Sequence, residues 1–220
     1  MKRPITRLRS LLSFLGDVKI EQVNSPINGK LTVVLSEGRC MLNTANATYS
    51  FEEKYTSFSK ALSTISTHIA TCRSALVLGL GLGSVPYILQ SAYRFSGPIT
   101  CVEIDPMVIA LAKRYYPASA DLSKLHIEEA DAVDWIATNT ARFDLIIGDV
   151  FLDARVPEAL HSIGFLQNLR RTVAPGGILL FSRILDRQRF ERTLWDNLRA
   201  VFPEAEEIDT GGNVVMCFRG

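Results

Sequence analysis

A glycine-rich turn is the first feature of this sequence that indicates chemistry. Gly79, Gly81 and Gly83 alternate with leucines in the segment 77–84, after a predicted strand and before a predicted helix. Glycine is needed where a backbone turns sharply and approaches a ligand closely, because a Cβ would collide with the ligand or forbid a positive φ. The turn therefore predicts contact between backbone and ligand. The alternative is a tight strand-to-helix turn that holds no ligand, and the turn alone does not decide between them.

Glu103 strengthens the case for a ligand at this turn. It lies 20 residues after Gly83, at the end of the next predicted strand. A carboxylate in this position can accept both ribose hydroxyls across a glycine turn. The pair therefore predicts an adenosine ligand but not its chemistry, because NAD satisfies the same geometry. Asp105 is predicted to cap the following helix, since Pro106 stands at the first helical position.

Two aspartates complete the candidate site. Asp131 follows the third predicted strand, where it either holds an adenine edge or caps the next helix, and the two roles are compatible. Asp149 ends the fourth predicted strand, and the carboxyl ends of strands line the ligand crevice in open α/β sheets. Asp149 is therefore predicted to take a proton from an attacking amine or to hold a cationic nucleophile. The alternative is a carboxylate that accepts loop N–H groups. Asp153 and Glu158 follow on the same loop, where they either add negative potential or are solvated surface residues.

Alternating strands and helices must position these residues. Apolar runs with little alternation indicate parallel strands covered on both faces, and they are predicted at 75–79, 99–104, 125–128, 143–147 and 178–181. Helices are predicted at 84–93, 106–115, from 131, at 157–173 and at 187–201. Strands at 205–208 and 214–218 then form a hairpin around Gly211-Gly212.

This order predicts an α/β fold with a doubly wound, seven-stranded, mostly parallel sheet and an antiparallel C-terminal hairpin, which is the class I methyltransferase type. A dinucleotide dehydrogenase would instead supply a second mononucleotide-binding half. The first third is predicted to be a small antiparallel β-meander, with strands at 17–23, 30–35 and 39–42. Helical periodicity follows from Phe51 to Ile69. We therefore expect a small N-terminal β-region at 1–50 and a nucleotide-binding α/β domain at 51–220.

Composition limits the partners. The sequence has 24 Lys and Arg against 23 Asp and Glu, so nothing global favours nucleic acid. Its four cysteines and three histidines are dispersed without the spacing of a metal site, so no metal is expected. No apolar run approaches the roughly 18 residues that a membrane-spanning helix needs, and no membrane partner is expected. The basic and apolar start predicts a short amphipathic helix or a frayed terminus rather than a signal peptide, hence a cytoplasmic protein.

With these residues in view, the chain resembles the spermidine synthase family of aminopropyltransferases, a branch of the class I S-adenosylmethionine-dependent methyltransferase fold. The resemblance runs from about residue 17 to residue 183 and rests on a few short segments. These are the glycine turn, Val102-Glu103-Ile104-Asp105, Asp131, Ile146-Ile147-Gly148-Asp149 and Ala174-Pro175-Gly176-Gly177. It implies decarboxylated S-adenosylmethionine as co-substrate, Glu103 at the ribose, Asp131 at the adenine amino group, Asp149 as the base and a homodimer.

Three segments depart from the family pattern. Leu82 stands where the family has an aspartate that binds the amino group of the aminopropyl tail. Tyr55-Thr56-Ser57-Phe58 replaces a tyrosine followed by His or Gln and then Glu, and Val150-Phe151-Leu152-Asp153 replaces a Ser-Ser-Asp-Pro type of segment. An unpaired buried ammonium is costly, so the pocket suits a less cationic acceptor or S-adenosylmethionine itself.

The sequence therefore predicts a spermidine synthase-like transferase that moves a methyl group to a small acceptor. Gly79, Gly81, Gly83, Glu103 and Asp131 would bind S-adenosylmethionine or its decarboxylated form, and Asp149 would be catalytic. If a methionine carboxylate is present, Ser84 or the segment 51–58 would receive it. Polyamine aminopropyl transfer is the first alternative, and an inactive nucleotide-binding or dimerisation module is the second. An NAD-dependent oxidoreductase shares the turn and the carboxylate but finds no hydride-transfer residues.

Overall fold

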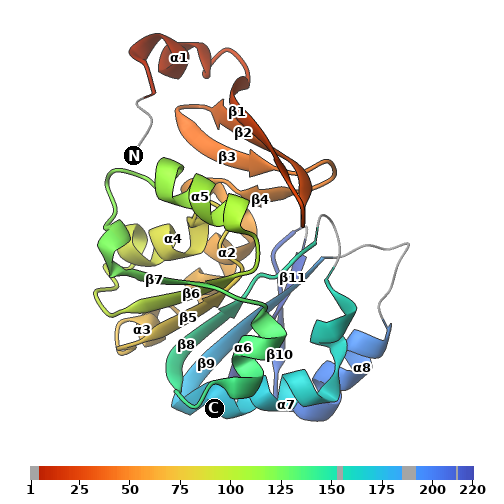
Figure 1. Ribbon diagram of the computed structural model, residues 1–220. Coiled ribbons are helices and arrows are strands. Elements are labelled where there is room, and N and C mark those ends of the chain that lie inside the picture. The colour runs from red at the N-terminus through yellow and green to blue at the C-terminus, as the bar shows by residue number, and fades with distance from the viewer. Residues whose placement is uncertain (1–4, 153–155, 185–191, 212) are drawn as a thin grey trace.

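The computed structural model describes all residues except 1–4, 153–155, 185–191 and 212. The described chain contains two separate sheets (Figure 1). The N-terminal sheet follows helix α1 (Arg7–Leu12) and is antiparallel, in the order β1-β2-β3-β4. Its strands are β1 (Val18–Ser25), β2 (Gly29–Ser36), β3 (Arg39–Asn43) and β4 (Thr48–Ser50). The predicted meander is confirmed, with β4 as an additional short strand.

The second sheet has seven strands in the order β10-β11-β9-β8-β5-β6-β7. Its strands are β5 (Ala75–Leu78), β6 (Ile99–Glu103), β7 (Leu125–Glu129), β8 (Phe143–Gly148), β9 (Val173–Ile184), β10 (Glu206–Asp209) and β11 (Asn213–Arg219). Strands β5 to β9 pair in parallel, whereas β11 lies antiparallel between β9 and β10. This order confirms the predicted class I methyltransferase-type fold.

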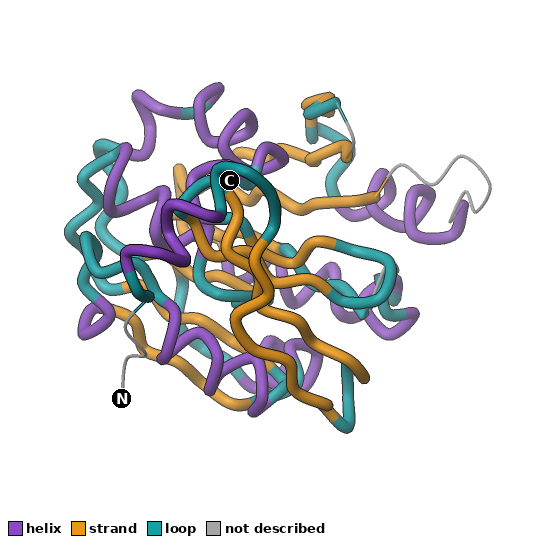
Figure 2. Tube along the Cα trace, turned by 90° about the horizontal axis from the view of Figure 1, so that it is seen from above, coloured by secondary structure: helices purple, strands orange, loops and turns teal. Residues whose placement is uncertain are grey.

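Helices lie on both faces of this sheet (Figure 2). One face carries α2 (Thr56–Thr64), α3 (Ser66–Ile69), α4 (Ser84–Ala92) and α5 (Pro106–Tyr115). The other carries α6 (Ala132–Thr138), α7 (Ile163–Thr172) and α8 (Arg192–Val201). Successive side chains of β5 point to opposite faces, so Val77 joins the first apolar cluster and Leu76 the second. Short 3₁₀ turns, η1 (Glu52–Lys54), η2 (Leu122–Lys124) and η3 (Glu158–His161), link these elements.

Two predicted helices differ from the structure. The pattern from Phe51 to Ile69 is divided into η1, α2 and α3, because the backbone leaves helical geometry at Tyr55 (φ −72°, ψ 81°) and again at Ile65 (φ −114°, ψ 17°). The helix predicted at 157–173 begins instead as η3 and continues as α7. Ser162 caps α7 by accepting a hydrogen bond from the N–H of Phe165. Of the helix predicted at 187–201, residues 187–191 lie outside the described residues. Within the part of the chain that is described, no helix has the length and apolarity to cross a bilayer.

Candidate active site

The glycine turn lies between β5 and α4, and neighbouring protein atoms leave no room for a Cβ at any of its three glycines. Gly79 has φ +85° and Gly81 φ +55°. A Cβ on Gly79 would overlap the carbonyl oxygen of Asp149, and one on Gly81 would come within 2.7 Å of the carbonyl oxygen of Tyr49. Both glycines also line a cavity. Gly83 does not line it, and a Cβ there would meet the ring of Tyr116.

Glu103 ends β6 and faces this turn. Its Oε2 accepts a hydrogen bond of 3.0 Å from the N–H of Leu80, and its Oε1 accepts one of 3.0 Å from the N–H of Asp105. Burial raises the pKa of Glu103, while these backbone donors act in the opposite direction. The carboxylate also lines the cavity. The predicted convergence of Glu103 and the glycine turn is therefore present in the structure.

Asp131 lies at the start of α6 and also lines the cavity. Its Oδ1 accepts a hydrogen bond of 2.7 Å from the N–H of Val133, so it caps the helix. The capping role is confirmed, and the side chain still borders the cavity. Asp105 is a cap as well, because its Oδ1 accepts from the N–H of Met107 at 2.8 Å.

Asp149 follows β8 and is the most perturbed acid of the site. Its backbone N–H donates to the carbonyl of Leu78, which holds the residue beside the glycine turn. Its Oδ1 is buried and has no hydrogen-bond partner among the described residues. Burial raises the pKa of Asp149 to about 7, although a hydrogen bond from the Tyr55 hydroxyl acts to lower it. Burial and then Asp149 raise the pKa of Tyr55 in turn. Perturbed acids of this kind are typical of functional sites.

These residues border a cavity of about 260 Å³. The five predicted residues that line it are Gly79, Gly81, Glu103, Asp131 and Asp149. Other lining residues were not named individually as site residues, and they include Ile27, Asn28, Tyr49, Tyr55 and Leu160. The first three come from the N-terminal sheet and its β1–β2 turn, in the part of the chain that the sequence predicted only as a small β-region. Tyr55 lies in the segment 51–58, which the sequence offered as a receiver of a methionine carboxylate. Glu158 is exposed and does not line the cavity, and Asp153 lies outside the described residues.

A chain of hydrogen bonds fixes the N-terminal sheet at the cavity. Asn28 Nδ2 donates to Asp105 Oδ2 at 2.7 Å, and the Tyr49 hydroxyl contacts Asn28 Oδ1 at 2.8 Å. The same hydroxyl lies 3.2 Å from the carbonyl oxygen of Phe151, in the segment after β8. The wall formed by Asn28 and Tyr49 is thus tied both to the start of α5 and to the segment that follows Asp149.

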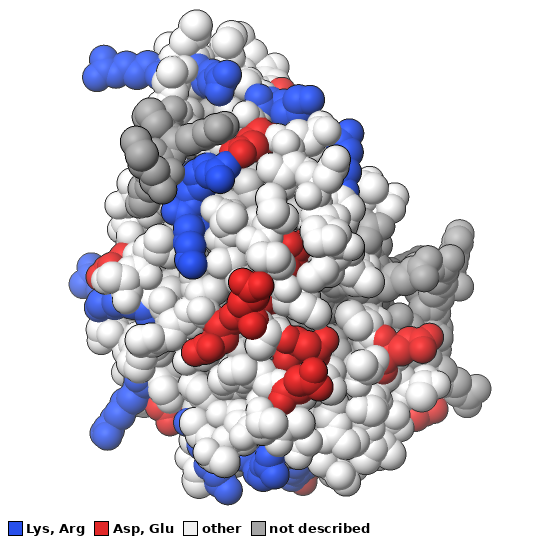
Figure 3. Space-filling view, viewed as in Figure 1, with Lys and Arg blue, Asp and Glu red and all other residues white. Residues whose placement is uncertain are grey.

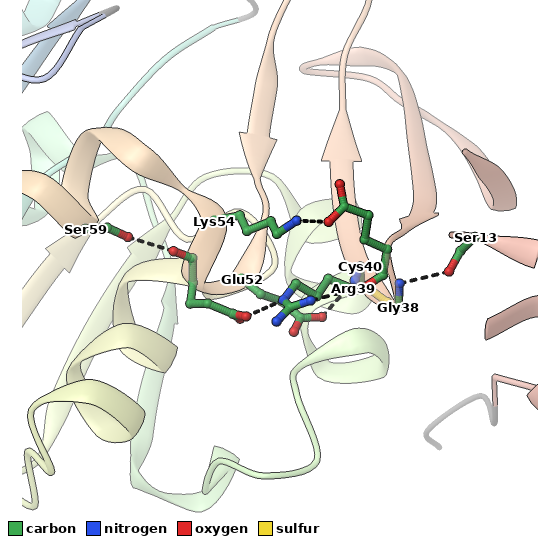
Figure 4. Close-up of polar contacts among 9 residues, drawn as sticks. Ser13, Gly38, Arg39, Cys40, Glu52, Lys54 and Ser59 are labelled. Carbon is green, nitrogen blue, oxygen red and sulfur yellow. Dashed lines mark hydrogen bonds and ion pairs between the residues drawn. The ribbon is translucent and has the colours of Figure 1, made fainter. Parts of the chain in front are cut away.

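A polar network holds η1, which immediately precedes Tyr55 (Figure 4). The Glu52 carboxylate accepts from the N–H of Cys40 at 2.7 Å, and the Ser59 hydroxyl donates to the carbonyl of Glu53 at 2.8 Å. Ion pairs join η1 to the β2–β3 turn, namely Arg39 with Glu53 and Lys54 with Glu37. These contacts fix the backbone from which Tyr55 reaches Asp149.

Two side chains considered in the sequence do not lie at the cavity. The Ser84 hydroxyl is 2.7 Å from the Ser50 hydroxyl and accepts from the N–H of Phe51, so it joins α4 to β4. Leu82 is only 3% exposed and packs in an apolar cluster with the N-terminal sheet. Neither is a lining residue. The Leu82 position therefore brings no charge to the cavity.

The chain is similar in sequence to known transferases. The chain is 31% identical over 132 residues to a probable polyamine aminopropyl transferase of Bifidobacterium longum (strain NCC 2705), covering 59% of this chain and 29% of that protein. It is 25% identical over 142 residues to an eEF1A lysine and N-terminal methyltransferase homolog of Drosophila melanogaster, covering 60% and 20%. The chain thus spans less than a third of the length of either curated relative.

A solved structure and a family model both match spermidine synthases. A spermidine synthase in complex with the transition state analogue AdoDATO matches with a TM-score of 0.73 at 16% identity, covering 91% of this chain and 73% of that one. At this identity the match bears on the fold. Residues 58–206, more than half of the chain, match the family model of the spermine/spermidine synthase domain. The chain therefore belongs to the spermine/spermidine synthase domain family.

Proposed function

We propose that this chain transfers the aminopropyl group of decarboxylated S-adenosylmethionine to the nitrogen of a small amine. The observation that carries the proposal is Asp149, a buried carboxylate with an unpartnered Oδ1 and a pKa of about 7, at the carboxyl end of β8. The family and the named aminopropyltransferase relatives favour this activity over the methyl transfer that the sequence led us to expect first.

The residues at the glycine turn fit an adenosyl nucleotide. Glu103 accepts backbone N–H groups on both oxygens, yet each carboxylate oxygen has two lone pairs, so it retains capacity for ribose hydroxyls. Asp131 uses one oxygen for its cap and offers the other to an adenine amino group. Gly79 and Gly81 supply a wall without side chains. In this assignment Glu103 and Asp131 orient the nucleotide, and Asp149 faces the acceptor.

The proposed transfer is a displacement at the propyl carbon attached to sulfur. The amine lone pair forms a C–N bond, and the C–S bond breaks with its electron pair going to sulfur. The sulfonium becomes the neutral thioether of methylthioadenosine, and the positive charge passes to the amine nitrogen. An amine enters mostly as ammonium, so it must lose a proton before attack, and ionised Asp149 accepts that proton. Holding nitrogen, carbon and sulfur in line supplies the rest of the rate acceleration, because the reacting atoms are already oriented for displacement.

Surface charge supports a cationic substrate. Acidic side chains gather on the middle of one face, around α6, while basic side chains lie mainly at its upper end and margins (Figure 3). A field of negative sign near a site raises the local concentration of small cations and repels polyanions. Both proposed substrates, a sulfonium and an amine, are cationic.

The test is product analysis with the full chain. Incubation with decarboxylated S-adenosylmethionine and a panel of amines is expected to release methylthioadenosine, measured by chromatography. Asp149→Asn is expected to lower the release rate by about 10²-fold or more, as for loss of a positioned base. The proposal fails if no amine in the panel yields methylthioadenosine while nucleotide binding is intact.

Methyl transfer is the second candidate, and two observations favour it. Leu82 places no carboxylate in the turn where an aminopropyl ammonium would need one, and one relative is named a methyltransferase homolog. Incubation with S-adenosylmethionine distinguishes the candidates, because methyl transfer would release S-adenosylhomocysteine. S-Adenosylhomocysteine without methylthioadenosine would replace the first proposal by the second.

A further inference from the structure

We infer that the acceptor of this site carries one ammonium group on an apolar body, rather than the two ammonium groups of a diamine. The inference rests on the proposed function, because it names the substrate class of the same site. It follows from where the carboxylates of the cavity lie, what already occupies them, and which side chains surround the acceptor end.

The strand order separates the acids of the cavity. Asp149 follows β8 and Asp131 follows β7, with β5 and β6 between these strands. Three strand spacings of 4.7–4.9 Å place the two strand ends roughly 14 Å apart. Glu103 stands at the end of β6 and bonds Leu80 of the glycine turn. Two of the three acids therefore belong to the nucleotide end, and Asp149 serves the acceptor end.

The surroundings of Asp149 are apolar. Val150, Phe151 and Leu152 follow Asp149 directly in the chain and line the cavity, and Leu160 and Ile27, from the β1–β2 turn, add further apolar lining. Among the described lining residues, this end holds no carboxylate besides Asp149. One ammonium pairs with Asp149, and the rest of the acceptor lies against hydrocarbon.

The polar groups at this end are neutral. Asn28 bonds Asp105 through Nδ2 and the Tyr49 hydroxyl through Oδ1, and the same hydroxyl lies close to the carbonyl of Phe151. Their oxygens keep lone pairs but carry no negative charge, and Asp149 pairs with the first ammonium. A second ammonium would lose its hydration without gaining a counter-ion, which disfavours a diamine.

The experiment compares pentylamine with 1,5-diaminopentane, which differ only in the second amino group. With decarboxylated S-adenosylmethionine, kcat/KM measured from methylthioadenosine release is expected to be at least tenfold higher for pentylamine. Equal or higher values for the diamine would overturn the inference while leaving the proposed function intact. Absence of methylthioadenosine with both amines would instead count against the proposed function.

Binding provides a readout that does not depend on turnover. Calorimetry of the enzyme with saturating methylthioadenosine is expected to give a Kd for pentylamine at least tenfold below that for 1,5-diaminopentane. Tighter binding of the diamine would contradict the inference even if no transfer is seen.

A gained carboxylate tests the physical cause. Leu152 lines the cavity and is 44% exposed, so the fold should accept a polar side chain there. Leu152→Asp is expected to raise kcat/KM for the diamine at least tenfold, whereas the matched Leu152→Asn should keep the preference for pentylamine. Asp153→Asn is expected to leave the preference unchanged. If the wild type prefers the diamine and Asp153→Asn abolishes that preference, a carboxylate outside the described residues supplies the counter-ion and the inference is wrong.

Discussion

Burial of Asp149 destabilises the folded chain when the side chain is charged, and the same burial suits it to accept a proton. Its Oδ1 is buried without a partner, and burial raises its pKa to about 7. A carboxylate that is ionised only in part near neutrality destabilises the folded chain whenever it is charged. A proton acceptor with a pKa near the working pH is efficient, so the same property serves the proposed proton transfer.

The rate should depend on the ionisation of Asp149. The kcat/KM of the wild type is expected to rise with pH and to level off above about 7, because the ionised acid takes the proton of an ammonium substrate. Asp149→Asn has no such base and must use the small fraction of free amine, so its kcat/KM is expected to keep rising through pH 9. The measurement is methylthioadenosine release between pH 5 and pH 9, and pH profiles of the same shape for both enzymes would contradict the role of Asp149.

The free energy of unfolding should fall as pH rises, because ionisation of buried Asp149 destabilises the folded chain. The pKa of Asp149 is about 7 in the folded chain against 3.8 for the ordinary side chain, so the native state retains a proton that the unfolded state releases. This group therefore lowers the free energy of unfolding as pH rises from about 4 to 7, and the loss is complete above 7. Asp149→Asn is expected to be more stable than wild type at pH 8, by on the order of 2–4 kcal/mol, and to lose this advantage near pH 4. Urea unfolding at both values measures it, and an equal difference at pH 4 and pH 8 would refute the assignment.

The glycine turn is the element on which the site depends, and its glycines are explained by packing. Gly81→Ala would hold an alanine at φ +55° with its Cβ 2.7 Å from the carbonyl oxygen of Tyr49. We expect the free energy of unfolding to fall by more than about 2 kcal/mol and nucleotide binding to weaken, because β4 must move. Gly164→Ala is the matched control, since Gly164 lies in α7 with open space around its Cα. The free energy of unfolding of Gly164→Ala should rise by up to about 1 kcal/mol, because alanine has a higher helix propensity than glycine. Thermal unfolding and calorimetry with methylthioadenosine compare them, and similar effects of both substitutions would contradict the packing argument.

Elements that make their own local signal were predicted from the sequence. Helix α5 spans the predicted residues 106–115, and the apolar strands lie close to their predicted bounds. Glu103, Asp131 and Asp149 lie at one edge of the sheet because parallel strands end together. Periodicity failed at Ile65, since it reports which side chains are buried and not whether the backbone stays helical. Residues 174–177, between a predicted helix and a predicted strand, lie within β9 at an irregularity of its pairing with β8. Ile27 could not be foreseen at the cavity, because its placement depends on packing between the two sheets.

At the scale of the whole molecule, the N-terminal sheet completes the site. Leu31 and Leu42 of this sheet pack with Leu82 of the glycine turn and with Leu111 of α5. Glu21 of β1 bonds the Tyr115 hydroxyl at 2.6 Å. One wall of the cavity therefore exists only while the two sheets are joined, so stability of the junction and substrate affinity are coupled.

Asp105 is the residue on which this junction can be tested. It is fully buried, caps α5, and accepts hydrogen bonds from the Ser25 hydroxyl and from Asn28 Nδ2 on the N-terminal side. Asp105→Ala removes the cap and leaves buried polar partners, which together cost about 2–4 kcal/mol. For a chain of this length, Tm is expected to fall by roughly 5–15 °C. Because Asn28 then loses its anchor at the cavity wall, KM for the amine should rise several-fold with a smaller change in kcat.

Asp121→Ala is the matched control, because Asp121 caps η2 in the same way, through the N–H of Ser123, but is exposed and does not bond the N-terminal sheet. The control should change Tm much less and leave KM unaltered. An equal effect of the two substitutions on KM would show that the contacts to Ser25 and Asn28 do not hold the N-terminal wall in place.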